Sequence, residues 1–341
     1  MSESRQRLVT AARYAIGLAV LAWLVSQTDW GKVAGTLGQI DPLVVVAILG
    51  LSIVGLLARF WTWHVLLNRL ARTPFRVAAG TTLSVAFVNH LSPTQAVGRS
   101  LAPVVLRQYT GRSWGTLVAV AALHTALYAT LYGLVATVGL LVFGLSMAPW
   151  LLAALAVSAA VYLVVGVTVI VAGTRLDGVG TLASGLERRL PTDRIPLAGE
   201  AIERFLGALP DLGADAAETF STLLGSPRTP IAYAAGWIVA LMAVPAARSW
   251  LLLDAVGEPF TPAILLPLAL VTAYAVTFVP VTPGGVGVAE ASGTLVLAAL
   301  GVPPAVGAPT ILVDRFLGVY LPALAGWYPT IQLDLSRTSG E

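Results

Sequence analysis

The chain of 341 residues is 57% hydrophobic and 11% charged, with a mean hydropathy of +0.84 and a net charge of +3. This composition excludes an ordinary soluble domain and predicts an all-α polytopic integral membrane protein, because apolar runs long enough to cross a bilayer recur along it. So small a basic excess gives no reason to expect nucleic-acid binding. The chain has no cysteine, and its three scattered histidines lack metal-ligand spacing, so we expect no metal and no cofactor.

Six apolar runs are long enough to cross a bilayer as single helices. The first, residues 8–26, follows Arg5 and Arg7 without a convincing cleavage site, so we expect a signal anchor. The others cover residues 43–67, 117–143, 150–172, 231–253 and 304–327. Two further apolar stretches, 77–106 and 264–300, are each interrupted by a polar break that contains proline. Their halves are too short to span, which predicts two re-entrant broken-helix hairpins.

The basic residues fall mainly on one side of this arrangement. With the N-terminus in the cytoplasm, sixteen of the twenty lie on the cytoplasmic side: Arg5, Arg7, Arg13, Arg59, Arg69, Arg72, Arg76, Arg107, Arg112, Arg175, Arg188, Arg189, Arg194, Arg204, Arg228 and Arg337. The outer loops carry Lys32 and acidic residues, and we place Arg248 near an outer helix end. The positive-inside rule therefore predicts a multi-pass protein of the cell (cytoplasmic) membrane with both termini in the cytoplasm.

The order of spans and hairpins repeats along the chain. Span, span, hairpin, span describes residues 8–143, and the same order in the opposite orientation describes residues 150–327. This predicts an inverted repeat within a single transmembrane domain, residues 1–341, with a binding site between the broken helices. Between the halves, residues 173–230 are expected to form a cytoplasmic amphipathic linker with short interfacial helices, or a solvated linker.

The polar break in the second hairpin contains the densest signal for a binding site. Thr282 followed by Pro283 has the pattern of an N-cap and the first position of a new helix. A helix that starts at membrane depth would direct free N–H groups and a partial positive charge into a cavity. Gly284, Gly285 and Gly287 would let an anionic group approach the backbone closely. The alternative interpretation is a packing kink with small residues at a helix crossing.

Four charged residues fall within apolar stretches, namely Arg99, Glu290, Asp314 and Arg315. Each would cost about 2.5–3.5 kcal/mol if it were unpaired at the centre of a membrane helix, so the four must pair or face a wet cavity. We expect an Arg99–Glu290 pair, either as part of an anion site or as a structural clamp between the hairpins.

A polar row on one predicted span is a candidate lining of the same cavity. His124, Tyr128 and Tyr132 recur every four residues, so they share one helix face. They either line a cavity or form a hydrogen-bonded seam between helices. His90, beside Asn89 at the tip of the first hairpin, is a further candidate.

The two broken stretches and the last span carry a resemblance to a known family. Residues 87–93, Phe-Val-Asn-His-Leu-Ser-Pro, with Gly98-Arg99, then residues 281–290, Val-Thr-Pro-Gly-Gly-Val-Gly-Val-Ala-Glu, and then Asp314-Arg315 resemble the flippase-like transmembrane domain of the lysylphosphatidylglycerol synthases. The resemblance covers nearly the whole chain. It implies the movement of a modified anionic or polyprenyl-linked lipid between leaflets. Nothing follows Glu341, so we expect a stand-alone member that lacks the soluble synthase domain, similar to members associated with hopanoid or glycolipid pathways.

The leading hypothesis is a lipid translocase with no enzymatic activity, acting on an anionic, aminoacylated or polyprenyl-linked lipid. Its headgroup phosphate would be held by Arg99, Arg315 and the amides of residues 282–285, while Glu290 and Asp314 balance charge. The predicted substrate-binding residues are Asn89, Arg99, Thr282, Pro283, Gly284, Gly285, Gly287, Glu290, Asp314 and Arg315.

Two other functions remain open from the sequence. The chain could be an accessory membrane subunit of a separate lipid- or glycan-modifying synthase, which would then be its partner beside the lipid. It could also be a membrane-embedded lipid-linked transferase or phosphatase, although no compact acidic pair suited to acid–base catalysis is present.

Overall fold

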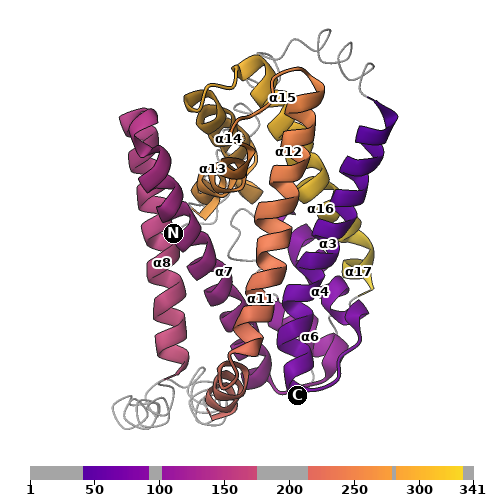
Figure 1. The fold of residues 1–341 in the computed structure, drawn as a ribbon. Helices are drawn as coiled ribbons and strands as arrows, with labels where there is room; N and C mark the ends of the chain where they lie inside the picture. Colours follow the sequence, from indigo (N-terminus) through magenta and orange to yellow (C-terminus); the bar gives the residue numbers. More distant parts are fainter. Residues whose placement is uncertain (1–40, 92–101, 175–213, 279–281, 333–341) are drawn as a thin grey trace, which may run out of the picture.

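The computed structural model describes residues 41–91, 102–174, 214–278 and 282–332, and every regular element in these ranges is helical (Figure 1). The α-helices are α3 (Pro42–Leu70), α4 (Phe75–Leu91), α6 (Ala102–Thr110), α7 (Trp114–Phe143), α8 (Pro149–Gly173), α11 (Arg228–Ile238), α12 (Val244–Ala255), α13 (Leu266–Tyr274), α14 (Val288–Ala299), α15 (Pro304–Arg315), α16 (Leu321–Ala325) and α17 (Trp327–Ile331). A further helix covers residues 214–224. The all-α class expected from the composition is confirmed.

Five helical segments are long and apolar enough to cross a membrane, so the chain is a multi-pass membrane protein. They are Pro42–Leu70, Trp114–Ser146, Pro149–Gly173, Arg228–Ala255 and Pro304–Ile331. These five coincide with the predicted runs 43–67, 117–143, 150–172, 231–253 and 304–327. The remaining predicted span, residues 8–26, lies outside the described residues.

The starts of these long helices are fixed by local chemistry. The Asp41 carboxylate accepts a hydrogen bond from the Leu43 N–H at 2.8 Å, and Pro42 is the first residue of α3. The Ser113 hydroxyl accepts from the Thr116 N–H at 3.4 Å at the start of α7. In both cases a side chain or a proline removes one of the free N–H groups that a helix start would otherwise expose.

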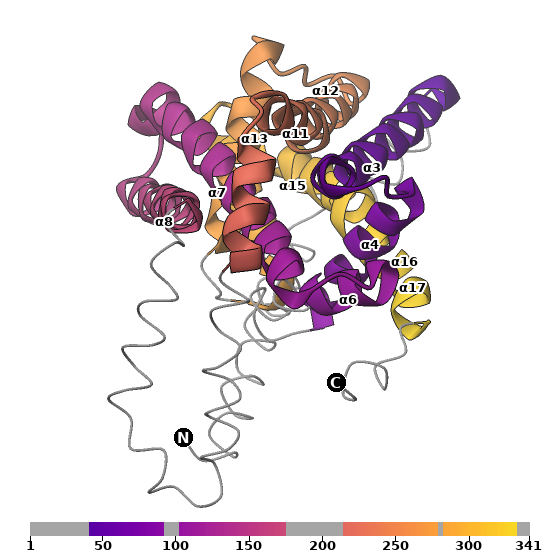
Figure 2. The same cartoon turned by 90° about the horizontal axis from the view of Figure 1, so that it is seen from below.

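Small residues allow α7 and α8 to pack closely side by side (Figures 1 and 2). A Cβ atom added to Gly133 of α7 would lie 2.9 Å from the backbone nitrogen of Leu163, and one added to Gly166 of α8 would lie 2.7 Å from the backbone nitrogen of Thr130. Close backbone approach of this kind is how membrane helices gain packing energy without a hydrophobic driving force.

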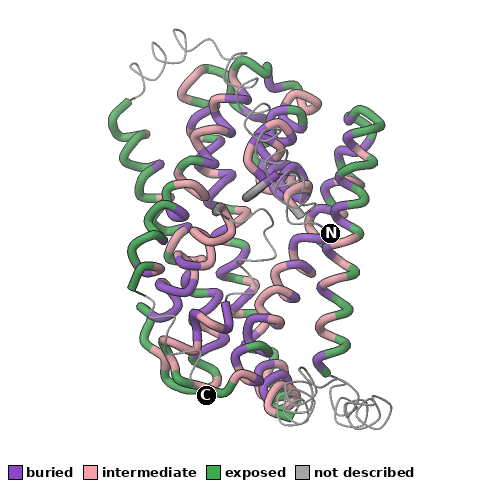
Figure 3. Tube along the Cα trace, turned by 180° about the vertical axis from the view of Figure 1, so that it is seen from behind, coloured by how far each residue is buried: buried purple, intermediate pink, exposed green. Residues whose placement is uncertain are grey.

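The outward faces of the long helices are apolar and exposed (Figure 3). On α3, Leu43 is 75% exposed and Val46 is 65% exposed, and on α8 Trp150 and Val164 are 62% and 65% exposed. Such faces would be unfavourable in water and suit contact with lipid.

The two broken stretches lie at opposite ends of the molecule. In Figure 1, α4 and α6 occupy the lower part and α13 and α14 the upper part. Their inner ends meet, because a Cβ atom added to Gly284, between α13 and α14, would lie 2.7 Å from Cδ2 of His90 at the end of α4. Residues 92–101, between α4 and α6, lie outside the described part of the chain.

Two of the long segments contain a widened turn near the middle. Val239–Ala243 joins α11 to α12 as a π-helical turn, and Phe316–Tyr320 does the same between α15 and α16. Pro245 and Pro322 are each the second residue after these turns, and each lacks the N–H that a regular α-helix would require there. Proline therefore accounts for both irregularities.

The end of the predicted linker packs against the bundle. In the helix at residues 214–224, Phe220 is 2% exposed and Leu223 is fully buried. The Phe220 ring lies where a side chain on Gly173, at the end of α8, would otherwise be. This part of the predicted segment 173–230 is thus anchored by apolar contacts, while residues 175–213 lie outside the described ranges.

Candidate functional site

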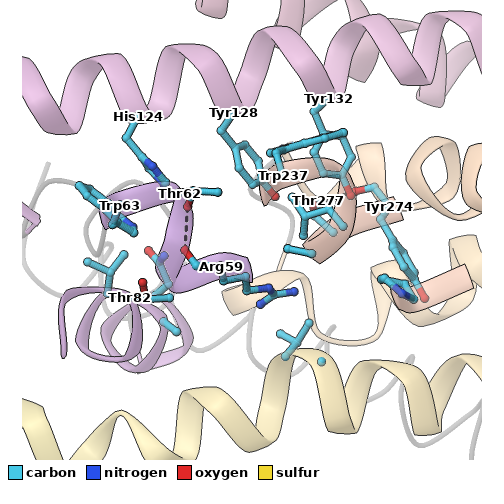
Figure 4. A pocket seen from close by; sticks show the side chains of 18 of the residues that line it. Arg59, Thr62, Trp63, Thr82, His124, Tyr128, Tyr132, Trp237, Tyr274 and Thr277 are labelled. Carbon is cyan, nitrogen blue, oxygen red and sulfur yellow. Dashed lines mark hydrogen bonds between the residues drawn. The ribbon is translucent and has the colours of Figure 1, made fainter. Parts of the chain in front are cut away.

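A partly open cavity of about 220 Å³ is lined by residues of the long helices and of the inner ends of the broken segments. Figure 4 shows its walls: Arg59, Thr62 and Trp63 from α3, His124, Tyr128 and Tyr132 from α7, and Tyr274 from α13. Residues from α4, α6, α11, α12 and α15, and from turns between the helices, complete the lining. The cavity is therefore built from both halves of the chain.

The wall formed by α7 is aromatic. The His124 ring stacks on Trp63 with 3.9 Å between ring centroids, and the Tyr233 hydroxyl donates to the His124 carbonyl at 3.0 Å. Tyr132 stacks on Tyr162 at 5.0 Å. His124, Tyr128 and Tyr132 therefore line the cavity and also pack against neighbouring helices. Both interpretations of their spacing, a cavity lining and a seam between helices, apply.

The first buried ion pair joins α14 to α15. Nε of Arg315 donates to Oε1 of Glu290 at 2.8 Å, and the Tyr320 hydroxyl donates to the same oxygen. Glu290 is fully buried and Arg315 is 6% exposed. The other carboxylate oxygen of Glu290 accepts the N–H of Gly287 at 2.7 Å. The predicted partner of Glu290, Arg99, lies outside the described residues, and the partner that the structure shows is Arg315.

The second buried ion pair joins α12 to α15. Arg248 donates to Oδ1 of Asp314 through Nε at 3.0 Å and through Nη2 at 2.5 Å. The Tyr274 hydroxyl donates to Oδ2 of Asp314 at 3.2 Å, and the Arg315 guanidinium lies 5.4 Å from the Tyr274 ring centroid. The two pairs thus form one network. Arg248 is only 3% exposed and faces the interior, and its placement near an outer helix end stays a prediction.

Arg59 is the third arginine of the cavity. It lies near the middle of the 29-residue α3, and the expectation that it belongs to the cytoplasmic flank was wrong. Among the described residues, no carboxylate forms an ion pair with it. A lone charge at this depth would cost about 2.5–3.5 kcal/mol on insertion scales, so its exposure to a polar cavity is what stabilises it.

The loop before α14 corrects the expected helix start. The α-helix begins at Val288 with Gly287 as its N-cap, five residues after the predicted position, and Pro283–Gly285 forms a short 3₁₀ turn. The Thr282 hydroxyl donates to the Val286 carbonyl at 2.8 Å, so it caps the loop and not a helix. The Glu290 carboxylate reaches back to the Gly287 N–H, so the helix start already holds an internal anion.

The glycines of this loop permit its backbone conformation. Gly284, Gly285 and Gly287 have φ values of 62°, 73° and 81°, a region that residues with a side chain rarely adopt. All three are buried, and the His90 ring packs on Gly284. Loop conformation and packing are sufficient reasons for these glycines, and close approach of an anionic ligand is not needed to explain them.

The structure gathers most of the predicted site residues around one cavity. Those that line it are Asn89, His90, His124, Tyr128, Tyr132, Gly284, Asp314 and Arg315. Thr282, Gly285, Gly287 and Glu290 lie buried beside this lining, and Pro283 is in the 3₁₀ turn. Arg99 lies outside the described ranges. Over the described part of the chain, no three His, Asp or Glu side chains gather as metal ligands would.

The site residues that were not predicted from the sequence include Arg59, Arg248, Tyr274 and Tyr320. A signal existed for the two arginines, because each is the only arginine in its apolar run, 43–67 or 231–253. The two tyrosines had no comparable signal, because only the fold places them beside Asp314 and Glu290.

Comparison with known proteins assigns the family. No curated protein and no solved structure matches the chain. A family model described as the lysylphosphatidylglycerol synthase TM region matches residues 10–326, a range that contains the whole cavity and both buried ion pairs. The chain therefore belongs to the family of the lysylphosphatidylglycerol synthase transmembrane region.

Proposed function

We propose that this chain is a lipid translocase that moves an anionic, aminoacylated or polyprenyl-linked lipid between membrane leaflets, without catalysing a reaction. The observation that carries the proposal is a cavity with three arginines and one carboxylate in its lining, enclosed by helices whose outer faces are apolar. Intramembrane charges that face a cavity mark substrate pathways in membrane proteins. The headgroup would enter the cavity while the hydrocarbon chains stay in the bilayer.

We also propose that α4–α6 and α13–α14 are re-entrant hairpins of an inverted repeat. Their placement at opposite ends of the molecule supports this, as do their short helices and the contact between Gly284 and His90 where the inner ends meet. Substrate sites of inverted-repeat transporters lie between such broken helices. Alternating access would then come from movement of one hairpin against the other.

The distribution of charge supports a cytoplasmic location for the lower end in Figure 1. Arg69, Arg72, Arg76, Arg107, Arg112 and Arg228 belong to the helix ends and connections of that side, whereas Asp41, Asp254 and Glu258 belong to the opposite side. Under this proposal both termini are cytoplasmic.

In this proposal the headgroup phosphate is bound mainly by side chains and less by the backbone amides of the loop. The Gly285 N–H donates to the Thr282 carbonyl and the Gly287 N–H donates to Glu290, so two amides of the loop are already satisfied. A headgroup phosphate would therefore be held by arginine side chains, among which we retain Arg315 and Arg99.

The test is lipid movement in liposomes that contain the purified full chain. Phosphatidylglycerol with a fluorescent label is placed in both leaflets, and a membrane-impermeant quencher reports how fast the inner label reaches the outside. Asn89→Ala, in the cavity lining, should slow this movement, whereas Asn68→Ala, exposed near the end of α3, should not.

The outcomes separate the three candidate functions. Movement faster than in protein-free liposomes supports the translocase. A chemically altered lipid would point to a membrane enzyme, and neither movement nor turnover would point to an accessory subunit of a separate synthase.

A further inference from the structure

Among the described residues, the cavity and its charge network hold one more positive than negative charge. Three arginines line the cavity, and two carboxylates, Asp314 and Glu290, complete the described network. Arg248 is paired with Asp314 and Arg315 with Glu290. The uncompensated charge is therefore that of Arg59.

Arg59 is placed to meet a ligand. Figure 4 shows its side chain reaching from α3 into the pocket, below the aromatic row of α7. Arg248, Arg315 and Asp314 are close enough to act on its charge, yet no described carboxylate is paired with it. A guanidinium that shares a cavity with two other arginines and has no carboxylate of its own among the described residues favours a neighbouring anion.

Four more polar atoms of the lining lack a partner among the described residues. They are Nη2 of Arg315, Oδ1 of Asn89, Nε2 of His90 and Nε1 of Trp237. Nδ1 of His90 lies 2.8 Å from the Ala86 carbonyl and must donate to it, so Nε2 of the neutral ring is an acceptor. Buried polar atoms are nearly always hydrogen-bonded. A donor at Arg315 suits an oxyanion, and the acceptor at His90 suits a hydroxyl group.

The size of the cavity limits what it can hold. Its 220 Å³ is below the roughly 300–1,000 Å³ of pockets that enclose drug-sized ligands. A headgroup fits this space, and a complete lipid with its acyl chains does not.

We propose that Arg59 is the anion anchor of this cavity, and that it makes the site selective for a lipid whose phosphodiester headgroup carries net negative charge and free hydroxyl groups. The inference rests on the proposed function, because it takes the phosphate to belong to a lipid. A phosphodiester between Arg59 and Nη2 of Arg315 supplies the one missing negative charge. An aminoacylated headgroup brings ammonium groups to a cavity with excess positive charge, and like charges in an interface oppose binding.

The experiment measures the binding of three probes to the purified full chain in detergent, with native mass spectrometry as the readout. The probes are short-chain phosphatidylglycerol, its lysyl ester and inorganic phosphate. The first two share the same phosphodiester and differ in net charge. We expect wild-type protein to bind phosphatidylglycerol at least about tenfold more tightly than the lysyl ester, and Arg59→Gln to bind it about ten- to a hundredfold more weakly than wild type.

Two variants serve as controls. Arg69→Gln removes an exposed arginine from the same helix and should bind phosphatidylglycerol like wild type. Arg59→Lys keeps the charge without the planar donor set and should lie between wild type and Arg59→Gln. Thermal unfolding should show Arg59→Gln to be at least as stable as wild type, because an uncompensated charge is removed.

Each outcome decides a separate point. Unchanged phosphatidylglycerol binding by Arg59→Gln, or tighter wild-type binding of the lysyl ester, would overturn the inference. Arg59-dependent binding of inorganic phosphate without binding of the lipid would keep the anion site and refute its lipid ligand. Lipid binding that depends on Arg59, without movement in liposomes, would refute the proposed translocation and leave this inference standing.

Discussion

The Glu290–Arg315 pair offers the most direct test of what stabilises the interior of this protein. Glu290→Gln keeps the shape of the side chain and removes its charge, and Arg315→Gln removes the other charge. Glu290 is fully buried, so its charge could not reach water without a change in packing, and Arg315, at 6% exposure, borders only the cavity. The pair is thus suited to a double-mutant cycle.

The expected magnitude follows from burial. Removing one partner of a buried pair costs about 3–5 kcal/mol, which is roughly a hundred- to a few thousandfold in the unfolding equilibrium. Glu290→Gln also leaves one amide oxygen to serve the Tyr320 hydroxyl and the Gly287 N–H, which two separate oxygens accept in the native protein. The double variant strands no charge, so its cost should be smaller than the sum of the single costs by at least about 1 kcal/mol.

The assay is reversible unfolding in mixed micelles with increasing dodecyl sulfate, followed by circular dichroism. Wild type, both single variants and the double variant are compared, with Arg69→Gln as a control for loss of an exposed arginine. If the two single costs simply add, or if Glu290→Gln unfolds like wild type, the reasoning about the pair is refuted.

Three further predictions concern packing, the second ion pair and topology. Gly133→Leu should separate α7 from α8 and lower the thermal unfolding temperature, since even a Cβ atom there would clash with the opposing backbone; a stability equal to wild type would contradict this packing. Asp314→Asn should destabilise the fold by about 3–5 kcal/mol by leaving Arg248 unpaired, and restored stability in Asp314→Asn/Arg248→Gln would identify the stranded charge as the cause. Single cysteines at the exposed positions Ser113 and Ser146, in a chain without native cysteine, should react with an impermeant thiol reagent from opposite sides of the membrane, because one long span separates them; labelling from the same side would rule that span out.

Five spans could be predicted from the sequence because the bilayer imposes a local constraint. Each needs about twenty apolar residues in one run, so length and composition suffice to find it. The break between α13 and α14 could be predicted for a similar reason, since Pro280 and Pro283, together with the glycines after them, disfavour a regular helix whatever the distant contacts are. The exact start of α14 was also encoded locally, in the spacing of Gly287 and Glu290, but Thr282-Pro283 presented a competing helix-start pattern.

Which charges pair was decided by the tertiary structure alone. Asp314 and Arg315 are adjacent in the sequence, yet they pair with residues on two different elements, Arg248 of α12 and Glu290 of α14. A single sequence shows that buried charges must be compensated, but it holds no information on which helices lie side by side. The role of Arg59 has the same origin: only the packing of α3 against the inner ends of the broken segments turns an isolated arginine in an apolar run into part of a cavity wall. Local chemistry therefore determined the helices, and the distances between helices determined the site.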